Sequence, residues 1–445
     1  MKTSSESDKM VQTAKVLRIT PLEKALYYVL LPLLAFRTLL TFFFLVLLDS
    51  SPLHWRQKLA LALLQAQRKA LPRRILRWTT NRTTTGQAVE GYCVSHRIAH
   101  ETVRLDASST GGAAARTSTK ALNIPPPILH LLNPADSDWY PPAPNGPVLV
   151  YFHGGGYVNP LRAPGHMPLI RRCGAACGAR RIIILEYSLA PEHPYPAQLV
   201  QCIETVRYVL HTLSVPPGDI ILAGDSAGGQ LVGGVLAHLV RPCPFALPLE
   251  LPTTATSSIS SKFRAAVMIS PFVRFPPPSP EVEGPDGGVP GSASASSYEL
   301  NASRDYLTRE QVDRFMEDFG AEGTEIYANL SAQAAAAEPV WAGVFGPERR
   351  LVEKVLVTVG TAEVFLDCCR FFADNCVKAD VWRIEKGSMI DEKLFEGKDY
   401  MLIECEGEVH VQPALDCAVM YEGGLMMKGI MGWMTAHCAT MENLR

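Results

Sequence analysis

The sequence DIILAGDSAGGQL, at residues 219–231, predicts a strand, a tight turn and the start of a helix. Residues 220–222 are apolar and suit a short buried strand, and the residues after the turn have apolar side chains at helical spacing. Gly224, Ser226 and Gly228 match the pattern Gly-x-Ser-x-Gly, which in this context holds a serine hydroxyl above the edge of a sheet. Ser226 is therefore a candidate nucleophile, and the alternative is an ordinary glycine-rich turn.

A second motif follows a predicted strand at residues 148–152 and reads His153-Gly154-Gly155-Gly156. Glycines at such a position let backbone N–H groups turn toward a developing oxyanion. The same letters also suit a phosphate-binding loop or a plain turn. A third motif, YSLAPEHPYPA, occupies residues 187–197.

The three motifs in this order resemble the hormone-sensitive-lipase family of α/β-hydrolases. The resemblance covers roughly residues 147–415 and includes a poorly matched insert. It implies an α/β-hydrolase fold, with a mostly parallel central sheet flanked by helices and a helical cap over the active site. It also implies that Tyr187 and the prolines of the third motif shape a turn near the pocket.

Apolar segments that alternate with helical patterns predict the same kind of sheet from the residues alone. The predicted strands are 148–152, 181–186, 220–222, 265–269, 355–359 and 401–404. Helices are expected over residues 51–79 and 303–319.

The catalytic base should be a histidine that comes after the acid in the chain, because this fold uses the order serine, acid, histidine. His410 follows the predicted strand 401–404, in the place where the resemblance puts the catalytic histidine. His238 lies in the helix directly after Ser226, and His437 is almost at the end of the chain. We therefore predict that His410 is the base.

The acid should follow the predicted strand 355–359, and two carboxylates are available there. The family pattern has an acid, three residues and then an aspartate, which puts Glu363 in the acid position and Asp367 in the trailing one. Families of this type more often have aspartate first, so Asp367 stays an alternative acid. Either side chain could instead be a favourable charge at a helix N-terminus.

The resemblance also implies which groups would stabilise the oxyanion. The donors are expected at Gly155, Gly156 and Ala227, because the residue after the nucleophile contributes in this fold. The residues expected to support this loop without touching the substrate are His153, Gly154 and Asp225.

Residues 25–48 form an almost unbroken apolar run. The run is about long enough to cross the core of a bilayer, which takes ~20 helical residues. Arg37 lies in the middle, and a central arginine costs about 2.5–3.5 kcal/mol. The many leucines, phenylalanines and valines return roughly 0.3–0.6 kcal/mol each, so insertion is still favoured. The sequence therefore predicts a single-pass membrane anchor. A buried core helix, or a hairpin bent at Pro32 that enters one leaflet, is the alternative.

These features predict four segments: a polar tail at 1–24, the anchor at 25–48, cap and linker helices at 51–123, and a catalytic domain at 124–445 with a flexible insert at 275–299. Basic residues flank the anchor almost equally, so they do not set its orientation. Sequons at Asn81, Asn301 and Asn329 favour a lumenal catalytic domain.

Composition excludes several other classes of protein. The chain has 445 residues and a net charge of −2, which gives no reason to expect a nucleic-acid partner. Its 11 cysteines lack paired zinc-site spacing and suit buried thiols better than a disulfide framework. We expect no metal and no cofactor, and the oligomeric state is left open.

Together these observations predict a membrane-anchored serine ester hydrolase. The anchored organisation resembles arylacetamide deacetylases and fungal steryl acetyl hydrolases. That likeness implies an endoplasmic-reticulum enzyme acting on small acyl esters of apolar alcohols. The alternative is a non-catalytic small-molecule-binding protein on the same scaffold, since some relatives have lost the catalytic histidine.

Overall fold

The computed structural model describes most of the chain, namely residues 19–49, 51–105, 124–136, 139–252, 261–273, 296–331 and 337–438. Most of the predicted tail at 1–24 and most of the predicted insert at 275–299 lie outside these residues.

A nine-stranded sheet forms the centre of the described structure, with the strand order β1-β2-β4-β3-β5-β6-β7-β9-β8. β2 pairs antiparallel with β1 and β4, and all other neighbours are parallel. The strands are β1 (Ala99–Arg104), β2 (Ile128–Asn133), β3 (Val148–Phe152), β4 (Arg181–Glu186), β5 (Ile220–Asp225), β6 (Phe263–Ile269), β7 (Val352–Gly360), β8 (Asp380–Ile384) and β9 (Tyr400–Cys405). The predicted mostly parallel sheet is confirmed.

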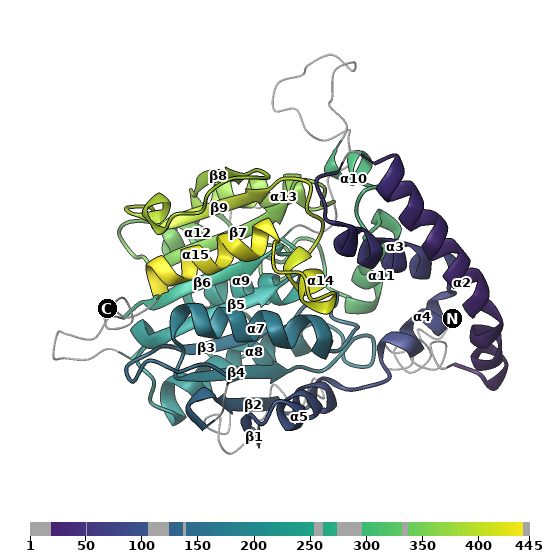
Figure 1. The fold of residues 1–445 in the computed structure, drawn as a ribbon. Helices are drawn as coiled ribbons and strands as arrows, with labels where there is room; N and C mark the ends of the chain where they lie inside the picture. The colour runs from purple at the N-terminus through teal and green to yellow at the C-terminus, as the bar shows by residue number, and fades with distance from the viewer. Residues whose placement is uncertain are drawn as a thin grey trace, which may run out of the picture.

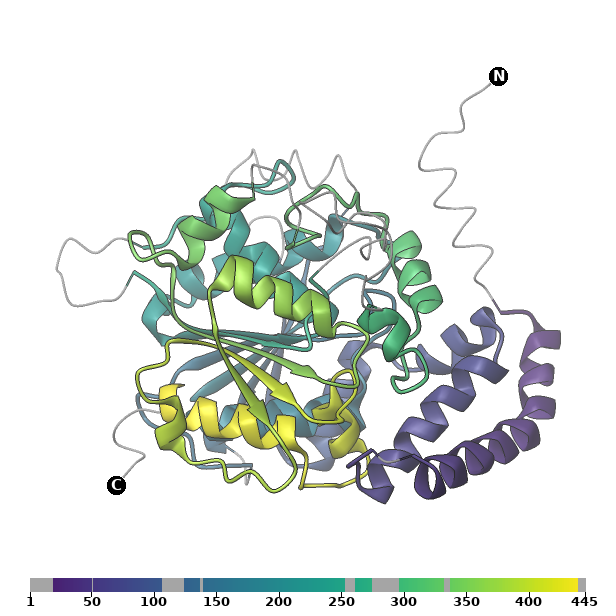
Figure 2. The same ribbon diagram turned by 90° about the horizontal axis from the view of Figure 1, so that it is seen from above.

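Helices cover both faces of this sheet (Figures 1 and 2). One face carries α5 (Thr85–Ser95), α7 (Ala163–Cys177), α14 (Gln412–Ala418) and α15 (Leu425–Cys438). The other carries α8 (Ala197–Arg207), α9 (Ala227–Val240), α12 (Glu338–Phe345) and α13 (Leu366–Phe372). Side chains alternate between the two resulting cores, so that Leu149 and Tyr151 of β3 face one core while Val150 and Phe152 face the other.

All six predicted strands are present, and β5 continues three residues beyond its predicted end because Ala223 and Gly224 still pair with β3 and β6. The sequence did not predict β1, β2 or β8. β1 and β8 are edge strands with polar, partly exposed residues, so their hydrophobic signal is weak. β1 lies within the segment predicted as cap and linker, which means that the sheet begins upstream of the predicted boundary at residue 124.

A group of helices stands at the edge of the sheet where the parallel strands end (Figure 1). These are α2 (Pro21–Leu47), α3 (Trp55–Ala70), α4 (Arg73–Thr80), α10 (Ser297–Leu300) and α11 (Arg309–Phe319). The helix predicted for 51–79 is therefore two helices, because Pro72 cannot continue the α3 hydrogen-bond pattern. The helix predicted for 303–319 begins only at Arg309, and Thr308 is its N-cap residue.

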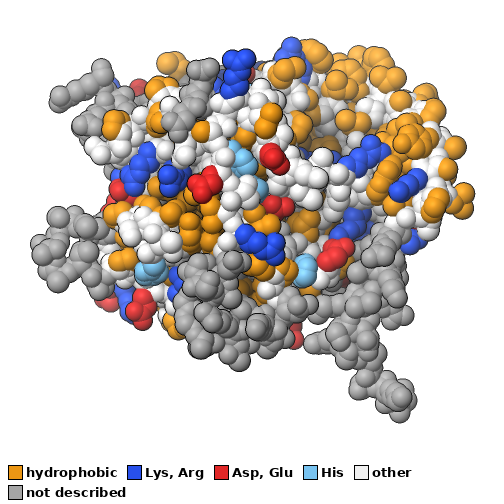
Figure 3. Space-filling model, turned by 90° about the horizontal axis from the view of Figure 1, so that it is seen from below, with side chains coloured by type: hydrophobic (Ala, Val, Ile, Leu, Met, Phe, Trp, Pro, Cys, Tyr) orange, Lys and Arg blue, Asp and Glu red, His pale blue; other side chains and the backbone are white. Residues whose placement is uncertain are grey.

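α2 is the one helix in the described residues that is long and apolar enough to cross a membrane. It packs along α3 and α4, with Leu34 and Leu45 buried in these contacts. At one end Glu23 forms an ion pair with Arg74 at 2.9 Å, and at the other the Lys58 Nζ donates to the Leu45 carbonyl at 2.7 Å. Its opposite side exposes large apolar side chains, which gather on this side of the molecule (Figure 3).

The turn between β5 and α9 requires two glycines for a steric reason. A Cβ on Gly228 would lie 1.9 Å from the Phe152 carbonyl oxygen, and one on Gly224 would lie 2.5 Å from the Gly228 backbone. α9 therefore approaches β3 and β5 more closely than any side chain would allow.

We expect Gly228→Ala to lower the free energy of unfolding by about 1–3 kcal/mol, because the new methyl group forces α9 away from β3. Gly91→Ala is the matched control, since Gly91 is exposed in α5 and its new Cβ would meet nothing within 4 Å. That change should stabilise the protein by roughly 0.5–1 kcal/mol. Urea unfolding of both variants measures these effects, and equal midpoints would contradict the close approach.

Candidate active site

Ser226 occupies the turn between β5 and α9 in a strained backbone conformation, with φ 51° and ψ −119°. A residue other than glycine adopts positive φ only when its surroundings enforce it. Here the Ser226 N–H donates to the Ile269 carbonyl at 2.9 Å, and the Ser226 carbonyl accepts from the Phe272 N–H at 3.0 Å. Ile269 at the end of β6 and Phe272 shortly after it thus fix the backbone of the turn.

His410 connects the serine to a carboxylate. Its Nε2 lies 2.9 Å from the Ser226 Oγ, and its Nδ1 lies 2.7 Å from the Glu363 Oε1. Glu363 is completely buried and His410 is 3% exposed, so water does not compete for these contacts. The structure therefore brings together the predicted serine, histidine and first-choice acid.

Glu363 is held in place by its second oxygen. The Ser270 hydroxyl donates to Oε2 at 2.9 Å, and the Gly360 N–H donates to the same atom at 3.1 Å. Asp367 lies in the first turn of α13 and accepts instead from the Ser297 N–H at 2.6 Å. The alternative acid thus has no contact with His410 among the described residues.

Three backbone N–H groups of the cavity wall have no acceptor in the described part of the chain. They belong to Gly155, Gly156 and Ala227, which all line the cavity that contains Ser226. Gly155 and Gly156 have φ values of 124° and 61°, which glycine adopts without strain. A Cβ on Gly156 would also lie 2.6 Å from the Phe315 ring, so a glycine is needed there twice over.

Asp225, beside the nucleophile, anchors this loop instead of joining the triad. Its Oδ1 accepts from the Tyr151 hydroxyl at 2.8 Å and from the Gly154 N–H at 3.0 Å, and its Oδ2 lies 3.3 Å from the His166 Nε2. Burial alone would raise the pKa of Asp225, but the His166 ring and the two donors bring that pKa below its ordinary value. The carboxylate is therefore ionised and fully engaged.

His153 supports the same loop from below. Its ring stacks on Tyr187 with centroids 4.3 Å apart, and its Nδ1 lies 2.7 Å from the Gly154 carbonyl oxygen. The Nε2 lies 3.1 Å from the Thr85 hydroxyl. Burial lowers the pKa of His153 to about 4, so the ring is neutral at pH 7. It supports the loop through stacking and hydrogen bonds.

A buried aspartate stands behind the acid loop. Asp305 accepts from the Val364 N–H at 2.9 Å and from the His410 N–H at 3.4 Å. Burial raises the pKa of Asp305 to about 6, against the opposing influence of His410 and with the help of the nearby Glu363 charge. The side chain ties the backbones of the acid loop and the histidine loop together.

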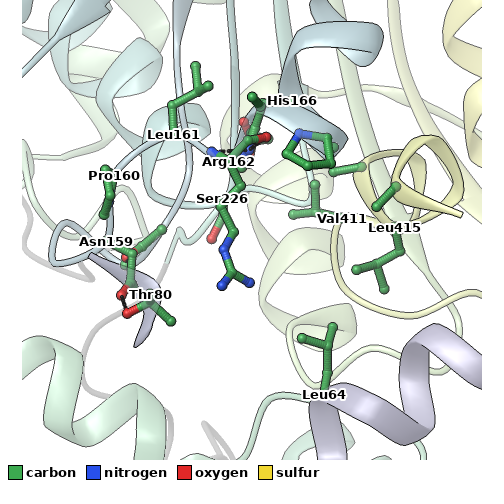
Figure 4. A pocket seen from close by; sticks show the side chains of 18 of the residues that line it. Leu64, Thr80, Asn159, Pro160, Leu161, Arg162, His166, Ser226, Val411 and Leu415 are labelled. Atoms are coloured by element: carbon green, nitrogen blue, oxygen red, sulfur yellow. Dashed lines mark hydrogen bonds and ion pairs between the residues drawn. The ribbon is translucent and has the colours of Figure 1, made fainter. Parts of the chain in front are cut away.

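These groups open into a cavity of about 1070 Å³ (Figure 4). Its floor contains Ser226, and Leu64 of α3 faces it from the cap. Much of the lining is apolar, and the cap helices supply part of the wall. The cavity slightly exceeds the usual 300–1,000 Å³ of ligand pockets.

The described residues contain no cluster of histidine, cysteine or acidic side chains arranged for a metal ion. All 11 cysteines are free thiols, and ten of them are buried. The predicted burial of these side chains is confirmed for ten of them.

Comparison with known families gives a clear match over residues 149–383, to a family described as having the alpha/beta hydrolase fold. The chain belongs to the α/β-hydrolase family. Among its relatives are a carboxylesterase of Mycobacterium tuberculosis, 35% identical over 172 residues, and an acetyl-hydrolase of Streptomyces hygroscopicus, 36% identical over 120 residues. These matches cover 33% and 26% of this chain, but only 52% and 39% of the relatives' own lengths.

Solved structures of esterases match most of the chain. An esterase of the bacterial hormone-sensitive-lipase family aligns with a TM-score of 0.52 at 21% identity, covering 87% of this chain and 99% of the other. A carboxyl esterase of the fungus Tuber melanosporum aligns with a TM-score of 0.51 at 18% identity, covering 77% and 89%. At these identities the likeness concerns the fold, and it agrees with the hormone-sensitive-lipase resemblance of the sequence motifs.

Sequence reasoning missed several residues of this α/β-hydrolase site. Ser270 directly follows a predicted strand. Because sites lie at the carboxyl ends of parallel strands, a polar residue at this position is a signal in the sequence for a site residue. Asp305, His166 and Thr85 lie in no motif and reach the site only through folding. No pattern in the sequence marks them.

We expect Glu363→Gln to slow the reaction of Ser226 with a fluorophosphonate probe by about 10²–10⁴-fold, because the amide no longer holds the His410 tautomer that accepts the serine proton. Asp367→Asn is the matched control and should react within a few-fold of the unmodified protein. Rates of labelling, with folding checked by circular dichroism, measure both. If Asp367→Asn were the unreactive variant, the acid assignment would be wrong.

Proposed function

We propose that the protein is a serine carboxylic ester hydrolase. The observation that carries this proposal is the hydrogen-bonded chain of Ser226, His410 and Glu363, in a cavity that Gly155, Gly156 and Ala227 also line. Nucleophile, base, orienting acid and oxyanion donors are the parts that acyl transfer to a serine requires. The names of the carboxylesterase and acetyl-hydrolase relatives support the same reaction class.

In the first step the Ser226 Oγ attacks the ester carbonyl carbon while its proton passes to the His410 Nε2. Glu363 accepts the Nδ1–H bond and stabilises the imidazolium that forms. The carbonyl oxygen becomes an oxyanion that accepts from the backbone N–H groups of the oxyanion loop and Ala227. The imidazolium then donates its proton to the leaving alcohol, which leaves an acyl ester on Ser226.

In the second step water takes the place of the alcohol. His410 removes a proton from the water, the hydroxide attacks the acyl carbon, and the same proton returns to the Ser226 Oγ as the carboxylic acid leaves. Every proton transfer in this cycle therefore passes through His410.

We infer that the substrates are small acyl esters of bulky, largely apolar alcohols. The size of the cavity and its apolar lining by residues such as Phe272, Phe315 and Leu415 support a bulky apolar partner. The small acyl group rests on the resemblance to deacetylases and on the named acetyl-hydrolase relative. A panel of p-nitrophenyl esters of graded chain length tests it.

The competing function is ligand binding without catalysis. A binding protein has no need of a nucleophile in hydrogen-bond contact with a base, and here His410 lies 2.9 Å from the Ser226 Oγ. Covalent labelling of Ser226 by a fluorophosphonate would favour the enzyme, and its absence would favour the binding protein.

We expect Ser226→Ala to abolish hydrolysis of a soluble p-nitrophenyl ester, with a loss on the order of 10⁶-fold in kcat, because the acyl acceptor is removed. The methyl side chain occupies less space than the hydroxymethyl group, so the fold should persist in circular dichroism. Ser388→Ala, at an exposed serine outside the cavity, is the control and should keep full activity. Full activity of Ser226→Ala would refute the proposal.

We also propose that α2 attaches the protein to a membrane. Its outer side exposes residues such as Val29, Phe36 and Phe43, which are 73%, 65% and 55% exposed. Contiguous apolar surface of this kind is unusual on a soluble monomer and indicates a membrane or protein partner. The inner side is already occupied by α3 and α4, so the free face is the one available to lipid.

Two of the three sequons give little support for a lumenal catalytic domain. The Asn301 Nδ2, the atom that would carry a glycan, donates to the Glu363 carbonyl at 2.8 Å, and the residue is 3% exposed. The Asn329 Nδ2 donates to the Gly323 carbonyl at 2.6 Å and that residue is also buried. A glycan at either position would have to displace these contacts.

We expect the full chain to stay with membranes after an alkaline carbonate wash, and a chain that lacks everything up to Asp49 to be released. A second variant, Leu40→Glu with Phe43→Glu, places two charges on the exposed side of α2 and should also be released. Val94→Glu, at a 75% exposed position on α5, is the control and should stay bound. Release of the full chain by the wash would refute a membrane-embedded α2.

The orientation of α2 is tested separately with an epitope at the N-terminus. If α2 spans the bilayer, the epitope and the catalytic domain lie on opposite sides and protease removes only one of them from sealed vesicles. If α2 lies in the plane of one leaflet, as its lengthwise contact with α3 would allow, both lie on the same side.

A further inference from the structure

The cavity beside Ser226 has an unbalanced positive charge. Three arginines line it, Arg68, Arg82 and Arg162, whereas Asp225 is the sole acidic residue among the described lining residues. The Asp225 carboxylate is already engaged by the Tyr151 hydroxyl, the Gly154 N–H and His166. No acid of the described lining is therefore available to neutralise the arginines.

Two of these arginines have partners that fix them in the wall. The Arg68 Nη1 donates to the Tyr306 carbonyl at 2.7 Å, and its guanidinium lies over the Tyr306 ring at 4.6 Å. The Arg82 guanidinium lies over the Trp78 ring at 4.2 Å. The Arg162 guanidinium, in contrast, has no hydrogen-bond acceptor or ion-pair partner among the described residues.

The backbone of Arg162 is nevertheless placed firmly with respect to the nucleophile. Its N–H donates to the His166 Nδ1 at 3.1 Å, and the Nε2 of the same ring reaches the Asp225 carboxylate next to Ser226. The Leu161 N–H, one residue earlier, donates to the buried Thr85 hydroxyl at 3.1 Å. Figure 4 shows the Arg162 side chain extending from this anchored backbone into the cavity, toward Leu64.

Arg162 is an exposed residue, so its guanidinium is open to a ligand that enters the cavity. The side chain stays accessible within the cavity, but burial by the surrounding protein lowers the pKa of Arg162. Its charge also acts on Arg68, whose pKa is lowered to about 10, first by burial and further by Arg162. An arginine remains charged under such conditions, and its five donors suit a planar or tetrahedral anion.

We propose that Arg162 binds an anionic group of the substrate, a carboxylate or a phosphate, while the ester of the same molecule lies at Ser226. This inference rests on the proposed ester hydrolysis and narrows its substrates to amphipathic esters, with one anionic group and an otherwise apolar body. Arg162 then selects and positions the substrate, and takes no part in bond breaking.

The test compares matched pairs of esters that differ in one charge. 4-Acetoxybenzoate and its methyl ester carry the carboxylate on the alcohol side, and mono-4-nitrophenyl adipate and its methyl ester carry it on the acyl side. 4-Acetoxyphenyl phosphate and its dimethyl ester test a phosphate. For each pair the quantity measured is the ratio of kcat/KM for the anionic ester to kcat/KM for the neutral one.

We expect Arg162→Gln to lower this ratio by about tenfold or more for at least one pair, mainly through KM. Arg162→Lys should restore part of the ratio, because lysine keeps the charge without the fork of donors. Arg349→Gln removes an exposed positive charge outside the cavity and should leave the ratio unchanged. The proposal is overturned if the ratio is the same in Arg162→Gln and in the unmodified protein for all three pairs. A structural defect would lower kcat/KM for the anionic and the neutral ester alike, so it cannot produce the expected change in the ratio.

A binding measurement separates this inference from the proposed hydrolysis. Benzoate and phenyl phosphate are added to the Ser226→Ala protein, and the change in its melting temperature is recorded. At least one of these two anions should raise the melting temperature, and the increase should disappear in the Ser226→Ala, Arg162→Gln double variant. Absence of any Arg162-dependent shift overturns the anion site even if the neutral esters are hydrolysed. A shift without ester hydrolysis keeps the site and refutes the hydrolase.

Discussion

The strained turn at Ser226 is the constraint on which the rest of the site depends. A non-glycine residue at φ 51° costs on the order of 1–3 kcal/mol, and the cost is met by packing and hydrogen bonds around it. Gly224 and Gly228 let α9 approach β3, while the end of β6 binds the Ser226 N–H and carbonyl. These contacts hold the hydroxyl above the sheet edge, where His410 can reach it from the end of β9.

Asp225 extends this constraint to the neighbouring loops. One buried carboxylate binds the predicted oxyanion loop through Gly154 and the start of α7 through His166. His166 in turn holds the backbone of Arg162. The proposed nucleophile, the proposed oxyanion donors and the proposed anion-binding arginine are therefore held relative to one another by Asp225, which reaches Arg162 through His166. An amide at this position would lack the charge that binds His166.

The sequence predicted the parts of the molecule that are encoded in continuous patterns. Apolar runs marked the central strands, and fixed spacings marked Ser226, the oxyanion loop, Glu363 and His410. It did not predict β1 and β8, because an edge strand buries little and so carries a weak apolar signal. It also missed Ser270, Asp305 and Arg162, since their importance comes from neighbours far away in the chain that only the folded structure brings close.

The helix α3 is coupled to the proposed catalytic residues through Asp305. Gln65 and Arg68 of α3 donate to the carbonyls of Asp305 and Tyr306, and the Asp305 carboxylate holds the Val364 N–H beside the acid. The other side of α3 packs against α2, whose free face is apolar. α3 thus packs against the proposed membrane helix on one side and lines the cavity on another. A shift of α2 at a membrane would therefore change the cavity wall through α3. It would reach Glu363 and His410 by two routes, through Asp305 and through the hydrophobic cluster that contains Leu45 of α2, Ala362 and Val409.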